Sequence, residues 1–359
     1  MKCILMIPAS GISTQVALVT RNTIKELDPR AKVLFYSVDF PGFFRNRNLP
    51  EISDKYTPGK QGRSFFTRLF RLHRMLSHRK GYREQLVLFQ ENVRLLPWIF
   101  FFTRKKPVLV HVVVTLNKNL SFWETLLCRL FSRPVLLNDR LLCTTLRRHN
   151  VPTYFTGNLP ADVLRPVALT FLPGSKTTLA FIPREKAFSE DIDAFLDLVL
   201  QLDKDGDMYY LLALPRGADI DSALPQLEKR GWFFRHSLEG DIIDGYLWNG
   251  SSYVNLTRFL AEAMEQADRV LSTDELRVLQ ATGLGKRSVF LSPGDTGSAV
   301  TLLNNNGLLL EHHRNYIHRF GKRGAVQKLA GYLLTGVVEE SYPPLTSHHL
   351  REAEARKAD

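Results

Sequence analysis

Polar and charged side chains follow an apolar run near residue 270, at a position where parallel sheets bind ligands. Residues 267–272 are typical of a short buried strand, and residues 276–282 have the pattern of a helix. A glycine turn at 283–286 leads into a second apolar run at 288–291, which predicts a strand, a helix and a parallel strand. Ligands sit outside the carboxyl ends of such strands. We therefore expect Ser272, Thr273 and Glu275 at a ligand site, where the amides of a helix N-terminus can bind an anion.

A second candidate loop follows the apolar run at residues 178–182. Pro183-Arg184-Glu185-Lys186 comes next, and residues 192–202 have the pattern of a helix. Strand, loop and helix in this order are what a phosphate-binding loop requires. Arg184 then faces a phosphate, or it is a solvated loop arginine. The segment Pro173-Gly-Ser-Lys176 has a similar composition but precedes its strand, which argues against the same role.

The N-terminal segment has the same order of elements. Residues 3–7 form a continuous apolar run, as in a strand that is buried on both faces, and residues 16–27 have a helical pattern. Ser10, Gly11 and Ser13 lie between them, and such small residues let a backbone approach a ligand. The alternative is an ordinary turn between a strand and a helix.

Apolar strands and amphipathic helices alternate along most of the chain. Further strands are expected at 32–38, 107–115, 134–137, 208–214 and 308–310, and a helix is expected at 255–267. The alternation continues on both sides of a linker at 164–176, which predicts two doubly wound α/β domains. We expect domains at 1–163 and 164–338, followed by a polar tail at 339–359.

Several of these segments resemble GT-B glycosyltransferases, in particular the lipid-A-disaccharide synthase group and its synthase-related branch. The resemblance rests on Ala267-Asp268 with the following strand and helix, on Gln280-Ala281, and on Gly283-Leu-Gly-Lys286. The stretch Gly157-Asn-Leu-Pro160 and the closing segment RFGKRGAVQKLAGYLL add to it. Glu275, Leu276 and Leu279 stand where the group usually carries a Gly-Thr pair and a glutamate.

The resemblance implies two Rossmann-like domains facing a cleft and a hexosyltransferase reaction. The donor is a nucleotide-sugar, UDP-linked, and no further cofactor is expected. Five residues of the C-terminal domain then bind the nucleotide-sugar: Arg184, Ser272, Thr273, Glu275 and Gln280. The loop with Ser10, Gly11 and Ser13 lies on the acceptor side, and the acceptor is a lipid or a lipid-linked sugar.

The catalytic residue stays unassigned. The group usually carries an aspartate after a central strand, and the matching segment here is Thr115-Leu-Asn-Lys118, with no acidic residue before Glu124. His111 lies inside the preceding strand, where a buried, hydrogen-bonded histidine is favoured over a catalytic one.

The charge and one amphipathic segment point to an anionic surface as a partner. Lys and Arg outnumber Asp and Glu by 48 to 36, which gives a net charge of +12. On a helix, Phe65, Phe66, Leu69 and Phe70 gather on one side, with Arg68 and Arg71 elsewhere. Together with LLPWIFFF at 95–102, this pattern predicts contact with an anionic membrane. The alternative is a helix packed on its own domain with a solvated basic face.

The N-terminus does not resemble a signal peptide, and no apolar run has the roughly 20 residues that a membrane span needs. We therefore expect a cytoplasmic protein, peripheral on the inner face of the plasma membrane. Three scattered cysteines do not predict a metal site or a disulfide framework.

Three functions remain open. The first is a glycosyltransferase acting in lipid biosynthesis, and the second is a catalytically degenerate protein with a binding or regulatory role. The third, nucleic-acid binding, has only the net charge in its favour, and no such partner is expected.

Overall fold

The chain folds into two compact units in the computed structural model. Unit 1 comprises Met1–Val163 and Arg323–Asp359, and unit 2 comprises Leu164–Lys322. The structure describes residues 3–8, 11–35, 85–91, 93, 95–167, 176–202, 208–215, 220–237, 242–292 and 294–337. None of the described helices is long and apolar enough to cross a membrane.

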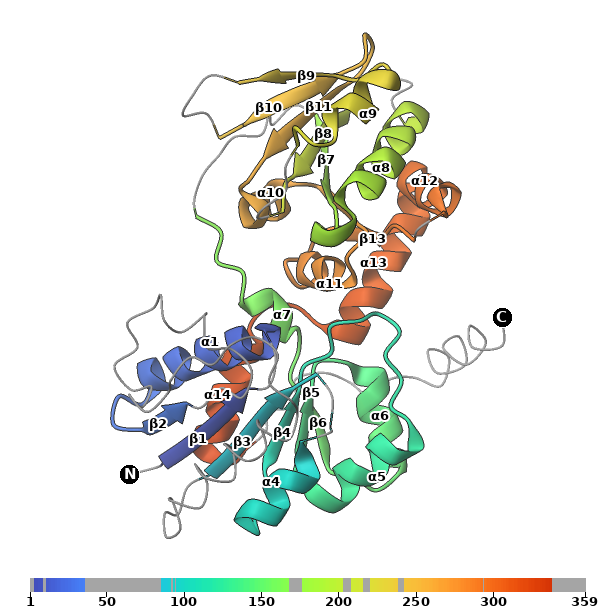
Figure 1. Cartoon of the computed structure of the whole chain (residues 1–359). Coiled ribbons are helices and arrows are strands. Elements are labelled where there is room, and N and C mark those ends of the chain that lie inside the picture. The colour runs from blue at the N-terminus through green and yellow to red at the C-terminus, as the bar shows by residue number, and fades with distance from the viewer. Residues whose placement is uncertain are drawn as a thin grey trace. The chain divides into compact units, whose positions relative to one another are not determined.

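The described part of unit 1 has one sheet with the strand order β2-β1-β3-β4-β5-β6, in which all neighbours are parallel (Figure 1). Its strands are β1 (Cys3–Pro8), β2 (Lys32–Phe35), β3 (Gln85–Gln90), β4 (Val108–His111), β5 (Val135–Leu137) and β6 (Thr153–Phe155). Its helices are α1 (Gly11–Leu27), α4 (Leu96–Thr103), α5 (Phe122–Phe131), α6 (Arg140–Arg148), α7 (Leu159–Asp162) and α14 (Ala325–Thr335).

Helices cover both faces of this sheet. On one face, Ile4 and Met6 pack with residues of α1 and α14. On the other face, Leu5 and Ile7 pack with residues of α4, α5 and α6. Successive side chains of a strand point to opposite faces, so burial on both faces explains the unbroken apolar runs in the sequence.

The last helix, α14, belongs to unit 1 although it follows unit 2 in the chain, and Figure 1 shows it beside α1. The carboxylate of Asp162 at the end of α7 accepts hydrogen bonds from the backbone N–H groups of Gly324 at 2.8 Å and Val326 at 2.7 Å. Burial raises the pKa of this carboxyl. Unit 2 spans residues 164–322, and the chain then returns to unit 1.

The described part of unit 2 has a second sheet with the order β13-β12-β7-β8-β11-β10-β9. Its strands are β7 (Thr177–Ile182), β8 (Met208–Ala213), β9 (Phe233–His236), β10 (Gly245–Trp248), β11 (Tyr253–Thr257), β12 (Arg269–Ser272) and β13 (Arg287–Phe290). Its helical elements are η1 (Glu185–Ala187), α8 (Phe188–Leu202), α9 (Leu224–Lys229), α10 (Leu260–Gln266), α11 (Glu275–Gly283), α12 (Thr296–Asn304) and α13 (Asn306–Phe320).

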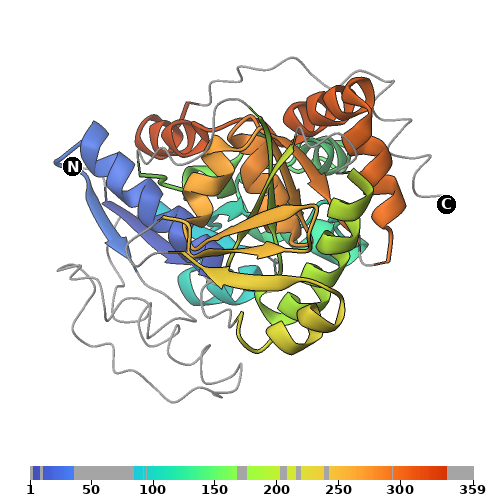
Figure 2. The same cartoon turned by 90° about the horizontal axis from the view of Figure 1, so that it is seen from above.

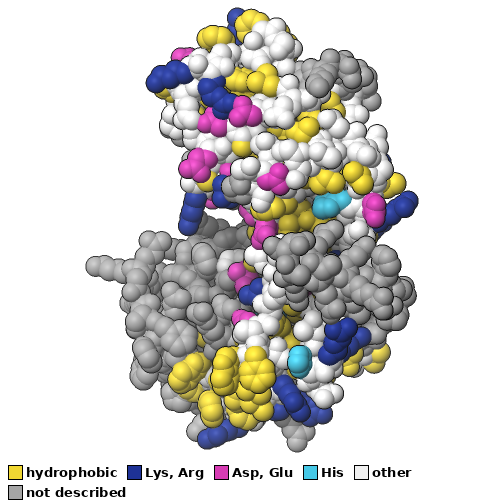
Figure 3. Space-filling model, turned by 90° about the vertical axis from the view of Figure 1, so that its right-hand side faces the viewer, with side chains coloured by type: hydrophobic (Ala, Val, Ile, Leu, Met, Phe, Trp, Pro, Cys, Tyr) yellow, Lys and Arg dark blue, Asp and Glu magenta, His cyan; other side chains and the backbone are white. Residues whose placement is uncertain are grey.

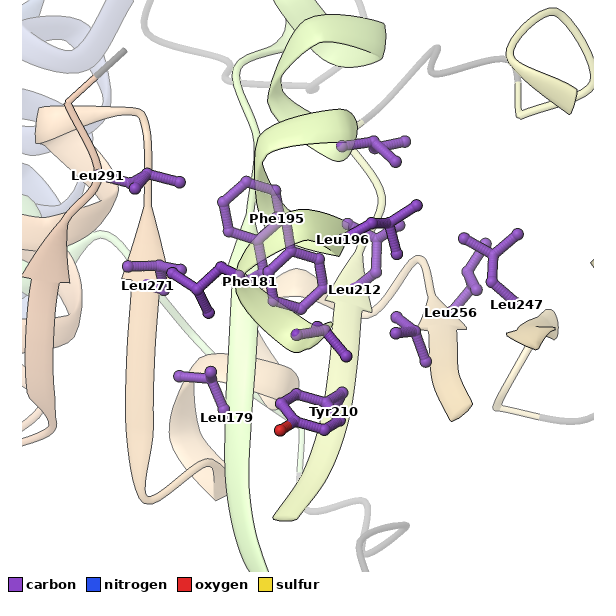
Figure 4. Packing of buried hydrophobic residues seen from close by; sticks show 14 of the residues in the cluster. Leu179, Phe181, Phe195, Leu196, Tyr210, Leu212, Leu247, Leu256, Leu271 and Leu291 are labelled. Atoms are coloured by element: carbon purple, nitrogen blue, oxygen red, sulfur yellow. The ribbon is translucent and has the colours of Figure 1, made fainter. Parts of the chain in front are cut away.

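This sheet is parallel from β13 to β11 and antiparallel at β11, β10 and β9, which form one edge (Figure 2). In its core, the ring of Phe181 on β7 stacks on Phe195 of α8, with centroids 4.4 Å apart (Figure 4). A second cluster on α10 and α11 covers the other face. Both units thus confirm the predicted class, two doubly wound α/β sheets.

Two predicted elements were wrong. Residues 255–257 end β11 instead of opening a helix, and α10 starts only at Leu260. Residues 308–310 lie in α13 instead of a strand, because the Asn305 side chain accepts from the N–H groups of Gly307 and Leu308 and caps that helix. A short apolar run fits a helix and a strand equally well until such a cap is recognised.

Candidate functional site

The carboxyl ends of β7 and β12 lie side by side where the strand order of unit 2 reverses. β8 and β11 lie on one side of β7, whereas β12 and β13 lie on the other. The register pairs Ile182 with Ser272, so the two following loops start at the same level. Ligands of doubly wound sheets bind at this point. The segments selected from the sequence, 183–186 and 272–275, are therefore neighbours in space.

Asp191, in the first turn of α8, ties the two loops together. Its carboxylate accepts from Nε of Arg184 at 3.0 Å and from Nη2 of Arg184 at 2.6 Å, which is a bidentate ion pair. It also accepts from the backbone N–H of Arg184 at 2.8 Å and from Oγ1 of Thr273 at 2.5 Å. The Thr273 hydroxyl in turn accepts from the same Arg184 N–H at 3.2 Å. One carboxylate thus holds residues from the ends of both strands.

The two charges of this pair differ in exposure. The Asp191 side chain is 4% exposed, whereas the Arg184 side chain is 37% exposed. Burial alone would raise the pKa of Asp191, but the hydrogen bonds from Arg184 and Thr273 outweigh it and lower the pKa. The same hydrogen bond raises the pKa of Arg184. A guanidinium has five N–H donors, and Asp191 uses two of them, so Arg184 keeps donors for a second anion.

The N-terminus of α11 is capped by its own chain. Ser272 Oγ donates to the carbonyl of Ile182 at 2.6 Å and accepts from the N–H of Asp274 at 3.0 Å. The Asp274 carboxylate accepts from the N–H of Leu276 at 3.0 Å. The Asp274 carboxylate therefore occupies a backbone N–H group at this helix end that was expected to be open to an anion.

Arg277 is a second guanidinium at this edge, and it was not among the residues predicted from the sequence. Its Nη1 donates to Oε1 of the buried Gln280 at 2.9 Å, and its Nε lies 3.8 Å from the Asp274 carboxylate. Burial lowers its pKa although the side chain is 32% exposed, and an arginine stays protonated at neutral pH in any case. Gln280 thus positions a charged group. The three-residue spacing from Asp274 to Arg277 was a usable signal.

The edge as a whole carries more negative than positive charge. Residues 183–191 and 272–277 contain five carboxylates, among them Glu275 in the first turn of α11, and three cations, which gives a net charge of −2. Carboxylates accept hydrogen bonds from vicinal hydroxyls, such as those of a ribose, and guanidinium groups bind phosphate. The mixture suits a ligand that has both hydroxyl and phosphate groups.

In unit 1, the strand order reverses between β1 and β3. The polar side chains at the carboxyl ends of β3 and β4 differ from those of unit 2. Gln90 and His111 end neighbouring strands and are paired in register. Nδ1 of His111 lies 3.2 Å from the carbonyl of Gln90, so this nitrogen carries the proton. Both side chains are buried, and among the described residues neither the Gln90 amide nor Nε2 of His111 has a hydrogen-bond partner. Burial, and then the charge of Lys118, lowers the pKa of His111 to about 4.

The expected acceptor-side loop is described only in part. Gly11 opens α1 and Ser13 is fully buried in its first turn, while Ser10 lies outside the described residues. The expected membrane-contact residues also lie outside the described part: Phe65, Phe66, Arg68, Leu69, Phe70 and Arg71.

The structure assigns Glu124 a structural role. Its carboxylate accepts from the N–H of Ser121 at 2.9 Å while the Ser121 hydroxyl accepts from the N–H of Glu124, which is a capping box at the start of α5. Within the described residues, no group of three or more His, Cys, Asp or Glu side chains is arranged to hold a metal ion.

No protein-family model and no curated protein sequence matches this chain. Solved structures match it over nearly its whole length at low identity. The UDP-GlcNAc 2-epimerase of Neisseria meningitidis, bound to UDP-GlcNAc, is 13% identical with a TM-score of 0.61, over 93% of this chain and all of that one. The S. aureus protein MnaA, solved with UDP, is 9% identical with a TM-score of 0.60, over 96% of this chain and all of that one.

A glycosyltransferase has the same fold. The lipopolysaccharide outer core galactosyltransferase WaaB is 11% identical with a TM-score of 0.53, over 94% of this chain and 99% of that one. The chain therefore has the fold of two Rossmann-like domains that GT-B nucleotide-sugar enzymes share.

Proposed function

We propose that unit 2 binds a UDP-sugar at the carboxyl ends of β7 and β12, and that the protein transfers the sugar to an acceptor. The observation that carries this proposal is the pair of guanidinium groups, Arg184 and Arg277, at the point where the strand order reverses. The similarity to a galactosyltransferase, and to two proteins solved with UDP or UDP-GlcNAc, supports a nucleotide-sugar.

The residues of the edge have separate roles in this proposal. Arg277 binds the diphosphate, because its ion pair with Asp274 is long, at 3.8 Å, and Arg184 adds its remaining donors. Glu275 accepts from ribose hydroxyls, while Ser272, Thr273 and Gln280 hold the loops and Arg277 in place. The two fixed guanidinium groups, held by Asp191 and Gln280, stabilise the departing diphosphate.

The finer assignment follows the resemblance in the sequence. We propose a hexosyltransferase similar to the lipid-A-disaccharide synthase group, with a lipid or lipid-linked acceptor, acting at the cytoplasmic face of a membrane. The net charge of +12 supports an anionic partner.

A binding protein without transferase activity is the second candidate, and specific observations favour it. The carboxylates of Asp191 and Asp274 occupy backbone N–H groups that a diphosphate would otherwise use, and the edge has a net charge of −2. Residues 115–118 contain no acidic side chain that could act as a base.

Nucleotide titration and a turnover assay separate these functions. UDP and UDP-GlcNAc are titrated by calorimetry, and release of UDP is followed with a membrane lipid extract as the acceptor. A ligand at 100 times its dissociation constant adds about 2.7 kcal/mol of stability, which a thermal-shift assay detects. Binding with UDP release supports the transferase, and binding without release supports the second candidate. If neither ligand binds, both are rejected.

Two variants test whether the Asp274 carboxylate opposes UDP binding at this edge. Asp274→Ser keeps a helix-capping oxygen but removes the charge, so we expect tighter UDP binding. The matched control is Arg258→Ala, an exposed arginine of unit 2 that is not part of this edge, which should leave the affinity unchanged.

A further inference from the structure

The outward faces of α4 and α5 in unit 1 are apolar, which is unusual for helices at a protein surface. In α5, the exposed Trp123 and Leu130 lie seven residues apart, on the side opposite the buried Thr125 and Cys128. In α4, Leu96 and Ile99 are buried, while Trp98 and Phe101 point away from them. An amphipathic surface helix would carry polar side chains at these outward positions.

Ring contacts join the two helices into one surface. α4 packs against α5, and the ring of Phe131 lies 5.3 Å from that of Phe100 and 6.0 Å from that of Phe101. At the start of α5, the rings of Phe122 and Trp123 lie 5.7 Å apart. The aromatic surface, as we name it, consists of Trp98, Phe101, Phe122, Trp123 and Leu130.

These five side chains are well exposed. Phe122 is 72% exposed, Trp123 is 69% exposed and Phe101 is 53% exposed. Among the described residues, thirteen large hydrophobic side chains are exposed, and five of them belong to this one surface. Single exposed hydrophobic side chains need no explanation, but a contiguous group indicates an interaction site.

Basic residues accompany the aromatic surface. Arg104, Lys105 and Lys106 follow α4, and Arg129 and Arg133 lie at the end of α5; all five are exposed. Residues 95–133 contain six Lys and Arg residues and a single acidic residue, Glu124, whose carboxylate caps α5. Figure 3 shows hydrophobic side chains gathered on the lower part of the visible face, with Lys and Arg at their border.

We infer that the aromatic surface docks onto an anionic phospholipid membrane. Trp and Phe insert at the level of the headgroups, while Lys and Arg contact lipid phosphates. A second copy of this chain is a poorer occupant, because a twofold contact would bring the same basic residues of both copies together. This inference rests on the proposed function for its context, since a lipid acceptor is reached at a membrane, but it requires no bound nucleotide.

Vesicle co-sedimentation of the full chain tests this inference. Vesicles of phosphatidylcholine alone are compared with vesicles of equal parts phosphatidylcholine and phosphatidylglycerol, at low and at high salt. We expect binding to the anionic vesicles only, and weaker binding at high salt. The triple variant Phe101→Ser, Trp123→Ser, Leu130→Ser should bind these vesicles more weakly by about tenfold or more. Its control is Leu200→Ser, Phe233→Ser, Tyr253→Ser, three exposed positions of unit 2 that should not change binding.

A second pair of variants tests the charge. Changing Arg104, Lys105 and Lys106 to Gln should weaken binding about tenfold or more. Changing Lys32, Lys229 and Arg258 to Gln lowers the net charge equally and should have a much smaller effect.

Three results would overturn the inference: no binding of the unchanged protein to anionic vesicles at low salt, equal binding by the triple serine variant, or a dimer that this variant disrupts without any vesicle binding. UDP titration of the serine variant separates the two proposals, because unchanged UDP affinity leaves the nucleotide site intact whatever the vesicles show.

Discussion

The carboxyl edges of the two sheets differ in how their polar side chains are satisfied. In unit 2, the charged Asp191 has four hydrogen bonds, from Arg184 and Thr273. In unit 1, the neutral side chains of Gln90 and His111 are buried, and within the described part of the chain the Gln90 amide and Nε2 of His111 have no hydrogen-bond partner. A satisfied buried charge stabilises the arrangement that binds it, whereas an unpartnered buried group opposes folding. The comparison indicates that the edge of unit 2 is organised by its polar groups and that the edge of unit 1 is held by its apolar core.

The two edges should respond to acid in different pH ranges. The pKa of His111 is about 4 in the folded protein, below its ordinary value, so the stability that depends on its neutral form is present above pH about 6.5. It is lost as the pH falls toward 4, and we expect unit 1 to lose about 2–4 kcal/mol over that range. Hydrogen exchange in urea, read on peptides of β4, measures this change.

His111→Phe is the control for this prediction, because it removes the titrating group. The variant should show little dependence on pH between 6.5 and 4. An equal loss of stability in the variant would show that other groups cause it.

Removing the Asp191 carboxylate should have the next largest effect on stability. Asp191→Ala leaves Arg184 and Thr273 without their shared acceptor, and we expect a loss of about 2–3 kcal/mol, reduced by the partial exposure of Arg184. Because the folded pKa of Asp191 is lowered, its contribution is present above pH about 3.9 and lost as the pH falls through the lower folded value. Urea unfolding at several pH values checks both points, and Asp191→Asn should lose less stability and also lose this pH dependence.

A matched pair of isosteric changes should give the smallest effects, of opposite sign. Thr273→Val removes a hydroxyl with two hydrogen bonds and should destabilise unit 2 by about 1–2 kcal/mol. Gln90→Met removes an unpartnered amide at similar volume and should stabilise unit 1 by up to about 1 kcal/mol. Urea unfolding of both variants checks this, and a clear destabilisation by Gln90→Met would contradict the contrast between the edges.

Local patterns predicted the position of the candidate site but not its contacts. Ser272, Thr273 and Arg184 were selected because they lie where a buried strand ends and before a helix begins. Asp191 was missed because an acidic residue in the first turn of a helix is common, and its partner lies in a loop seven residues earlier. Its second partner, Thr273, is 82 residues away, which no local pattern reports.

Local patterns also predicted only part of the fold. Both doubly wound sheets follow from alternating strands and helices, but β3 was not predicted, because its short apolar run gives no clear periodicity. The Asp162 carboxylate likewise binds N–H groups at the start of α14 that are more than 160 residues away, which no local pattern reports.

Hydrogen exchange with and without UDP tests the central claim, that the edge of unit 2 is the nucleotide site. Added UDP should slow exchange in peptides covering residues 183–186 and 272–277, and leave peptides of β3 and β4 unchanged. Arg277→Ala should weaken UDP binding by about 1.5–3 kcal/mol and abolish this protection at the same concentration. Protection confined to unit 1, or UDP binding that is unchanged in Arg277→Ala, would contradict the account.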